Sequence, residues 1–127
     1  MLSLRSDKES VLYLAISDKP EIEFRYSNGD VYKGDLLQGL AHSHGIMESK
    51  TGGYQYIGIW NKGLRQGKGV CTYVDGSVYR GLFFDDKRHG SGYMQYLNGD
   101  KYQGNWENDQ RSGDGVMTLA SGDVYYG

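Results

Sequence analysis

The sequence predicts an all-β protein, built as an elongated, twisted antiparallel meander of tandem β-hairpins in one open sheet. The main observation is a motif of about 23 residues: Tyr-x-Gly-x-aromatic, a polar turn, Gly-x-Gly, an apolar strand and a second turn. Its leading tyrosines follow one another in steps of 24, 23, 23 and 23 residues: Tyr32, Tyr56, Tyr79, Tyr102 and Tyr125. A fixed period of this length is typical of repeat architectures.

Composition favours an ordered intracellular array. The chain has 20 glycines, one proline and 12 tyrosines, and because the glycines follow the period they belong to the repeat unit. A net charge of -2 gives no general attraction to nucleic acid or anionic membranes. The single cysteine, Cys71, excludes an intrachain disulfide and favours a reducing compartment. With no signal-peptide core and no apolar run of about 18 residues, we expect a cytoplasmic protein.

Each repeat is predicted to be one hairpin. In 79–101, Tyr79, Gly81 and Phe83 alternate with residues of the opposite face, as in a strand. Asn-Gly at 28–29 and 98–99, and Asp-Gly at 75–76, are strong hairpin-turn signals. The expected units are a half repeat at 22–31, full repeats at 32–55, 56–78, 79–101 and 102–124, and the start of another at 125–127.

Two stretches depart from the pattern. The repeat 32–55 has one extra residue, and Ser43 replaces the first glycine of its Gly-x-Gly pair, so we expect a bulge or longer turn around 49–53. Residues 1–21 carry no clear motif and are expected to cap the array. The apolar run 11–16 favours a degenerate hairpin strand, whereas Ser6 with Glu9 fits the capping box of a short helix.

Aromatic residues recur in columns and are expected to pack the sheet, with the strand glycines leaving room for their rings. A single sheet has no obvious covering layer, so part of the ring surface is expected to remain exposed as a groove for a protein partner. The candidate protein-binding face comprises Tyr56, Trp60, Tyr79, Phe83, Tyr102 and Trp106.

A second candidate site is a row of arginines at one rim. Arg65, Arg88 and Arg111 are spaced by one period and could meet an anionic partner, either a lipid headgroup or an acidic helix. Polybasic membrane sites usually gather four to eight cations, so the row falls short of that pattern. Solvated turn positions are the simpler interpretation.

No residue pattern indicates catalysis, a metal or a cofactor. The Gly-x-Gly pairs lead into strands, whereas phosphate loops precede a helix N-terminus. His42 and His89 occupy the same repeat position two units apart, roughly 20 Å at two strands per unit. His42 and His44 lack a nearby third ligand. We therefore expect neither enzyme activity nor nucleic-acid binding.

The pattern Tyr-x-Gly-x-Trp, Gly-x-Gly and Tyr-x-x-Gly resembles the MORN repeat (membrane occupation and recognition nexus). The resemblance covers 22–127 and is closest in 56–78, 79–101 and 102–124. It implies an elongated sheet of hairpins. Members of that family include axonemal radial-spoke heads, junctional-membrane tethers, cytoskeletal adaptors, and N-terminal segments of lipid kinases and SET-domain methyltransferases.

The resemblance implies a non-enzymatic protein-interaction or scaffold module, the N-terminal part of a larger cytoskeletal or axonemal protein, in the cytoplasm or a cilium. One alternative is a membrane-peripheral phospholipid tether that uses the arginine row. Another is a regulatory segment of a multidomain enzyme. The strand begun at 125–127 presents a sheet edge, which either continues into further sequence or pairs with a second copy.

Overall fold

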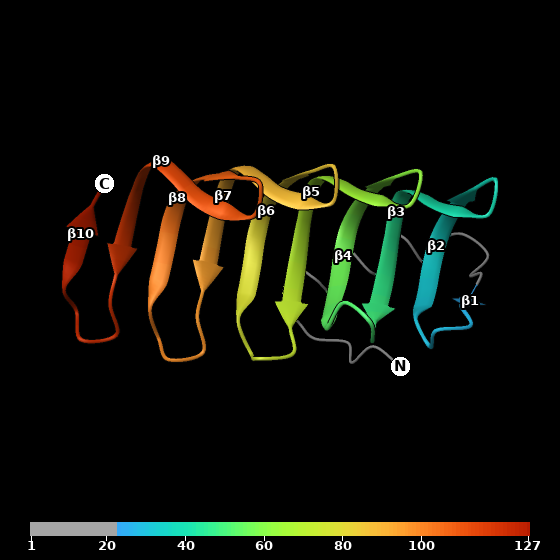
Figure 1. Ribbon diagram of the computed structural model, residues 1–127, viewed down its shortest axis with the longest axis horizontal. Coiled ribbons are helices and arrows are strands. Elements are labelled where there is room, and N and C mark those ends of the chain that lie inside the picture. The colour runs from blue at the N-terminus through green and yellow to red at the C-terminus, as the bar shows by residue number, and fades with distance from the viewer. Residues whose placement is uncertain (1–22) are drawn as a thin grey trace.

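The computed structural model describes residues 23–127 as a single antiparallel sheet of ten strands in chain order. Figure 1 shows the strands side by side along the long axis, with no helix in this part of the chain. The prediction of an open all-β meander is confirmed. The predicted cap, 1–21, lies outside the described residues. The strands are β1 (Glu23–Arg25), β2 (Val31–Leu37), β3 (Leu40–Ser49), β4 (Tyr54–Asn61), β5 (Leu64–Tyr73), β6 (Val78–Phe84), β7 (Lys87–Gln95), β8 (Lys101–Glu107), β9 (Gln110–Thr118) and β10 (Val124–Tyr126).

Tight turns join the two strands of each hairpin. In the β6–β7 turn, Asp85 and Asp86 have φ of 54° and 69°, and the β8–β9 turn has similar values. Two successive residues with positive φ match the right-handed twist of the flanking strands, and Asp and Asn tolerate this conformation. The Asn-Gly and Asp-Gly pairs lie in the other row of turns, which connects one hairpin to the next.

Every repeat contains a register shift, opposite the first residue of its Gly-x-Gly pair. In β4 and β5 the shift falls between Gly58 and Trp60, and Gly67 on the facing strand has φ of +85°. Ser43 adopts φ of 64° at the equivalent place, although it is not glycine. The sequence predicted an irregularity in the first repeat only, around 49–53. The structure has a turn there, closed by a 3.0 Å hydrogen bond from Gly53 N to Ser49 O.

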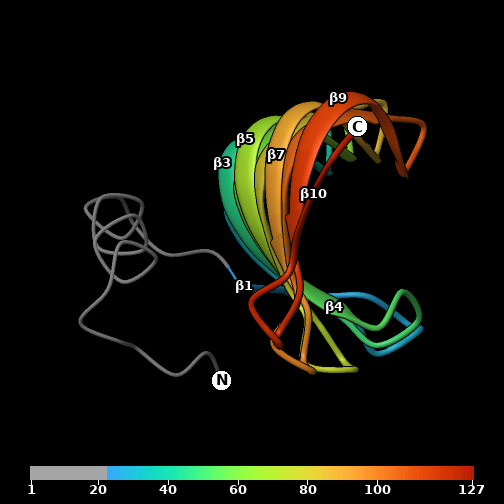
Figure 2. The ribbon, with the colours of Figure 1, turned by 90° about the vertical axis from the view of Figure 1, so that its left-hand side faces the viewer.

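The tyrosine of each motif stabilises this irregularity. The Tyr56 hydroxyl donates to Ile59 O at 3.0 Å, and Tyr79 donates to Leu82 O at 2.8 Å. Both carbonyls belong to the residue that the pairing within its own hairpin leaves out, although that residue still pairs with the preceding strand. The hydroxyl therefore supplies a hydrogen-bond donor at the register shift. The strands bend around the ring at this point. Viewed along its long axis, the sheet is therefore curved into a C-shaped section (Figure 2).

The core lies on the inside of the bend. Each Trp or Phe of the motif packs edge-on between the tyrosine of its own repeat and that of the preceding repeat. Centroid distances are 5.0 Å for Tyr56–Phe83 and 5.1 Å for Tyr79–Phe83. A Cβ added at Gly92 would lie 2.2 Å from the Tyr79 hydroxyl, which confirms that this glycine makes room for a ring. The alternating rings thus join consecutive hairpins into one core.

Candidate functional site

The candidate aromatic face is buried: its rings pack the sheet as expected, but the expectation that part of their surface stays exposed is wrong. Relative exposure ranges from 0% to 7% for the six residues: Tyr56, Trp60, Tyr79, Phe83, Tyr102 and Trp106. The expectation treated the sheet as flat. The strands bend, so the two rows of turns rise on either side of the concave face (Figure 2), and the aromatic residues there are buried by the sheet itself. These rings pack the array and leave almost no surface for direct contact with a partner.

A groove of about 660 Å³, the concave groove, lies above this core and is lined by residues of both rows of turns. Its open surface includes Met47 and the half-buried tyrosines Tyr26, Tyr54 and Tyr73. Its walls are polar and include Asp30 at one row of turns and Asp86 and Asp109 at the other. Half-buried tyrosines beside charged side chains suit recognition of a peptide or protein surface.

The arginine row borders this groove, and its first member is bound within the sheet. Arg65 is 9% exposed. Its Nε donates to Asp86 Oδ1 at 2.7 Å, and its Nη2 donates to Asp86 O at 2.7 Å. Its guanidinium also lies 4.2 Å from the centroid of the Tyr54 ring. The arginine of one hairpin thereby clamps the turn of the next.

Arg88 repeats this arrangement one period later. Its Nε and Nη2 donate to Oδ1 and the carbonyl oxygen of Asp109, both at 3.0 Å, and its guanidinium lies 4.8 Å from the Trp106 ring. Arg111 stacks 5.6 Å from Tyr102 and has no carboxylate partner among residues 23–127. Two members of the row are thus partnered by aspartates. Anionic binding along the whole row remains a prediction.

Burial and hydrogen bonds together set the charge states of the titratable side chains in the concave groove. Burial raises the pKa values of the Tyr54 and Tyr73 hydroxyls, so both are neutral at physiological pH. Burial also favours a higher pKa for Asp30, but hydrogen bonds outweigh it and hold the pKa of that carboxyl below its usual range. The donors include the backbone N–H of Lys50 at 2.8 Å and of Thr51 at 3.3 Å. Asp30 is therefore a carboxylate at physiological pH. Its hydrogen bonds tie the turn between β1 and β2 to the turn between β3 and β4.

None of the three histidines lines the concave groove. His42 Nδ1 accepts a 3.1 Å hydrogen bond from Lys62 N, and the His89 ring lies 5.8 Å from that of Phe84. Within residues 23–127, no group of three or more His, Cys, Asp or Glu side chains could hold a metal ion. Over the same residues, no helix is long and apolar enough to cross a membrane.

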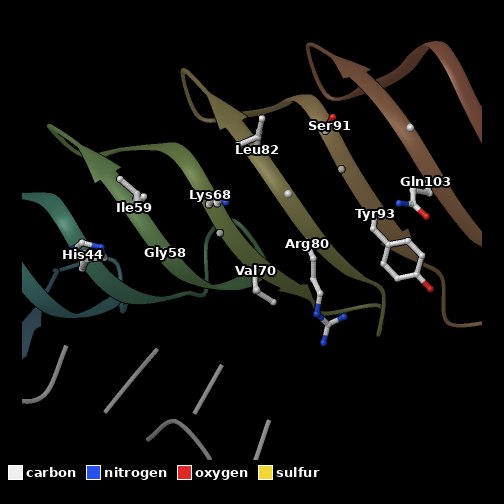
Figure 3. A pocket seen from close by; sticks show the side chains of 14 residues that line it. His44, Gly58, Ile59, Lys68, Val70, Arg80, Leu82, Ser91, Tyr93 and Gln103 are labelled. Atoms are coloured by element: carbon white, nitrogen blue, oxygen red, sulfur yellow. The ribbon is translucent and has the colours of Figure 1, made fainter. Parts of the chain in front are cut away.

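The opposite face of the sheet carries a second depression, the outer-face groove, with a volume of about 870 Å³. Figure 3 shows side chains on either side of a strip of glycine backbone, among them Ile59 and Leu82 on one side and Val70 and Tyr93 on the other. The strip forms because glycines pair across successive strands, as Gly58 does with Gly69. Side chains at these positions would point to the core face.

Sequence reasoning predicted an aromatic groove but assigned it to other rings, and it missed the outer-face groove. It assigned the binding surface to the six motif rings and not to Tyr26, Tyr54 or Tyr73. One signal in the sequence could have identified Tyr73 as a groove residue. Tyr73 lies on the same face as buried Cys71, two residues farther along β5 from the glycines at the bend. Distance from the bend along the strand, which alternation does not encode, decides whether a ring is covered.

A family model described as MORN repeat matches four consecutive stretches, 32–54, 56–78, 79–101 and 102–124. No curated protein sequence matched the chain. The four stretches coincide with the hairpins β2–β3, β4–β5, β6–β7 and β8–β9, together with the turn that follows each hairpin.

Proposed function

Because the chain belongs to the MORN-repeat family, we propose that it is a protein-interaction module whose binding site is the concave groove. MORN repeats are commonly protein- or lipid-interacting modules, and the family is a non-catalytic repeat module. The chain's function is to hold a protein partner along the inside of the curved sheet. The cytoplasm, at a cytoskeletal or axonemal assembly, is the proposed setting.

The half-buried tyrosines of the concave groove carry this proposal. Tyr26, Tyr54 and Tyr73 come from successive parts of the array and present their open edges to one groove. Their inner edges are held by the sheet, so little conformational entropy is lost when a partner covers them. Tyrosines of this kind are enriched in binding hot spots.

The charge pattern favours a protein over an anionic lipid surface. Arg65 and Arg88 already bind Asp86 and Asp109, and both aspartates line the concave groove. A phospholipid headgroup would have to compete with these carboxylates and approach their negative charge. A protein can instead offer donors to the aspartates and apolar groups to the tyrosines.

The test is affinity capture from cell extract with the full chain and two variants. The groove variant carries Tyr26→Ala and Tyr73→Ala. The control carries Leu97→Ser, a turn position that is 77% exposed and does not line the groove. A protein held by wild type and control but lost with the groove variant is expected, and the purified protein should then bind with at least about tenfold weaker affinity to the groove variant.

Circular dichroism and melting must show that the groove variant remains folded. Retention of every captured protein by that variant contradicts the proposal. Phosphoinositide-containing vesicles are tested in parallel across a salt series. Salt-sensitive vesicle binding that is lost in Arg111→Ala would favour the phospholipid tether instead.

A further inference from the structure

The outer-face groove combines apolar walls with positive charge. Its aliphatic and aromatic walls include Ile59, Leu82 and Tyr93, and Lys68 and Arg80 also line it (Figure 3). Among residues 23–127, no aspartate or glutamate lines this groove. Such a groove is complementary to an apolar segment flanked by carboxylates.

The burial of two isoleucines indicates that this face has a cover. Ile46 on β3 pairs with Ile57 on β4, and Ile57 pairs with Val70 on β5, which lines the outer-face groove. All three side chains therefore lie on the outer face, yet Ile46 is only 2% exposed and Ile57 only 5%. Residues 23–127 contribute only the strands of one sheet and the turns that join them. On the convex outer face the bend spreads side chains apart, so neighbours in the sheet shield an isoleucine laterally but leave its tip accessible. Burial this complete on that face requires a further layer.

We propose that the outer-face groove is the docking site for the chain's own apolar segment at 11–16. This segment reads Val-Leu-Tyr-Leu-Ala-Ile, and Glu9 precedes it while Asp18 follows it. Its apolar side chains match the walls of the groove, and its flanking carboxylates match Lys68 and Arg80. It supplies the layer that covers Ile46 and Ile57.

The connecting chain is long enough for this contact. Six residues, 17–22, separate the segment from β1, and a chain of that length reaches at most about 20 Å. The groove extends from β3 to β8, and β3 is two strand spacings from β1, roughly 10 Å. Segment 11–16 itself spans up to another roughly 20 Å, so together they can cover the groove past β6.

The test is site-specific photo-crosslinking in the full chain. Leu82 is replaced with p-benzoyl-phenylalanine, and the control carries the same group at Leu97, a turn position outside the groove lining. Equal amounts of unlabelled and 15N-labelled protein are mixed before irradiation. The expected product joins the position of Leu82 to residues 11–16 within one molecule, whereas the control gives no such product.

Two variants test the chemistry of the contact. Leu12→Asp with Leu14→Asp should lower the yield of the product at least about tenfold, because the apolar match is lost. Lys68→Glu should lower it severalfold, because the groove loses a cation. The proposal is overturned if no product includes residues 11–16, or if the double variant gives an unchanged yield. Products that join unlabelled to labelled chains also overturn it and identify a second copy as the occupant.

Discussion

Gly92→Ala tests whether the glycines exist to admit the tyrosine rings. The added Cβ would lie 2.2 Å from the Tyr79 hydroxyl oxygen and 2.3 Å from Cε1. Ordinary contacts are about 3.5 Å or longer, so the ring would have to retreat by roughly 1 Å. It cannot do so freely, because Phe83 and Trp106 pack edge-on against it at 5.1 and 5.4 Å. Retreat would also break the 2.8 Å hydrogen bond to Leu82 O.

These effects give a measurable loss of stability. Overpacking costs about 1–3 kcal/mol, and the lost hydrogen bond adds about 1 kcal/mol. Alanine recovers about 0.4–1 kcal/mol by restricting the unfolded chain. The net loss in the free energy of unfolding is about 1–4 kcal/mol, with a middle value that lowers the melting temperature by about 10 °C.

Thermal melting of Gly92→Ala should be compared with Gly113→Ala. At Gly113 an added Cβ meets only Asn105 Nδ2 at 3.7 Å, and the substitution costs only the strain of its φ of +60°, about 1 kcal/mol. A Gly92→Ala variant that melts with or above the Gly113→Ala variant would refute the packing argument.

Two other predictions concern the polar groups of the concave groove. Arg65→Met should lower the free energy of unfolding by about 1–2 kcal/mol in urea, allowing for the solvent exposure of Asp86, and Arg65→Lys should fall between it and wild type. An Arg65→Lys variant as stable as wild type would show that the two-point clamp is unimportant. The hydrogen bonds to Asp30 stabilise the fold fully above its unfolded-state pKa near 3.8, and this contribution is lost as the pH falls through the lower folded-state pKa. Asp30→Asn should therefore flatten the decline of the urea midpoint below about pH 4, and parallel pH curves for the two proteins would contradict this assignment.

Periodicity predicted the fold class, but it could not predict curvature. The recurrence of Tyr-x-Gly-x-aromatic identifies the hairpins and their order, because both follow from short-range patterns. The bend depends on the Tyr56 hydroxyl reaching Ile59 O, a contact that alternation does not encode. For that reason the rings of Trp60 and Phe83 were expected to stay partly open, and the structure has them buried.

The arginine row illustrates a related limit. Equal spacing placed Arg65, Arg88 and Arg111 correctly at equivalent positions along one rim. Spacing alone could not show that the turn of the next hairpin supplies Asp86 to Arg65 and Asp109 to Arg88. Partners 21 residues apart in sequence are neighbours only because each hairpin packs on the one before it.

The most direct test of the proposed function is photo-crosslinking from inside the concave groove in living cells. Tyr73 is replaced with p-benzoyl-phenylalanine, and Leu97 carries the same group in a matched control. Our account predicts discrete protein adducts from the position of Tyr73 that the control does not form. Lipid adducts alone, or the same adducts from both positions, would contradict a protein-binding groove.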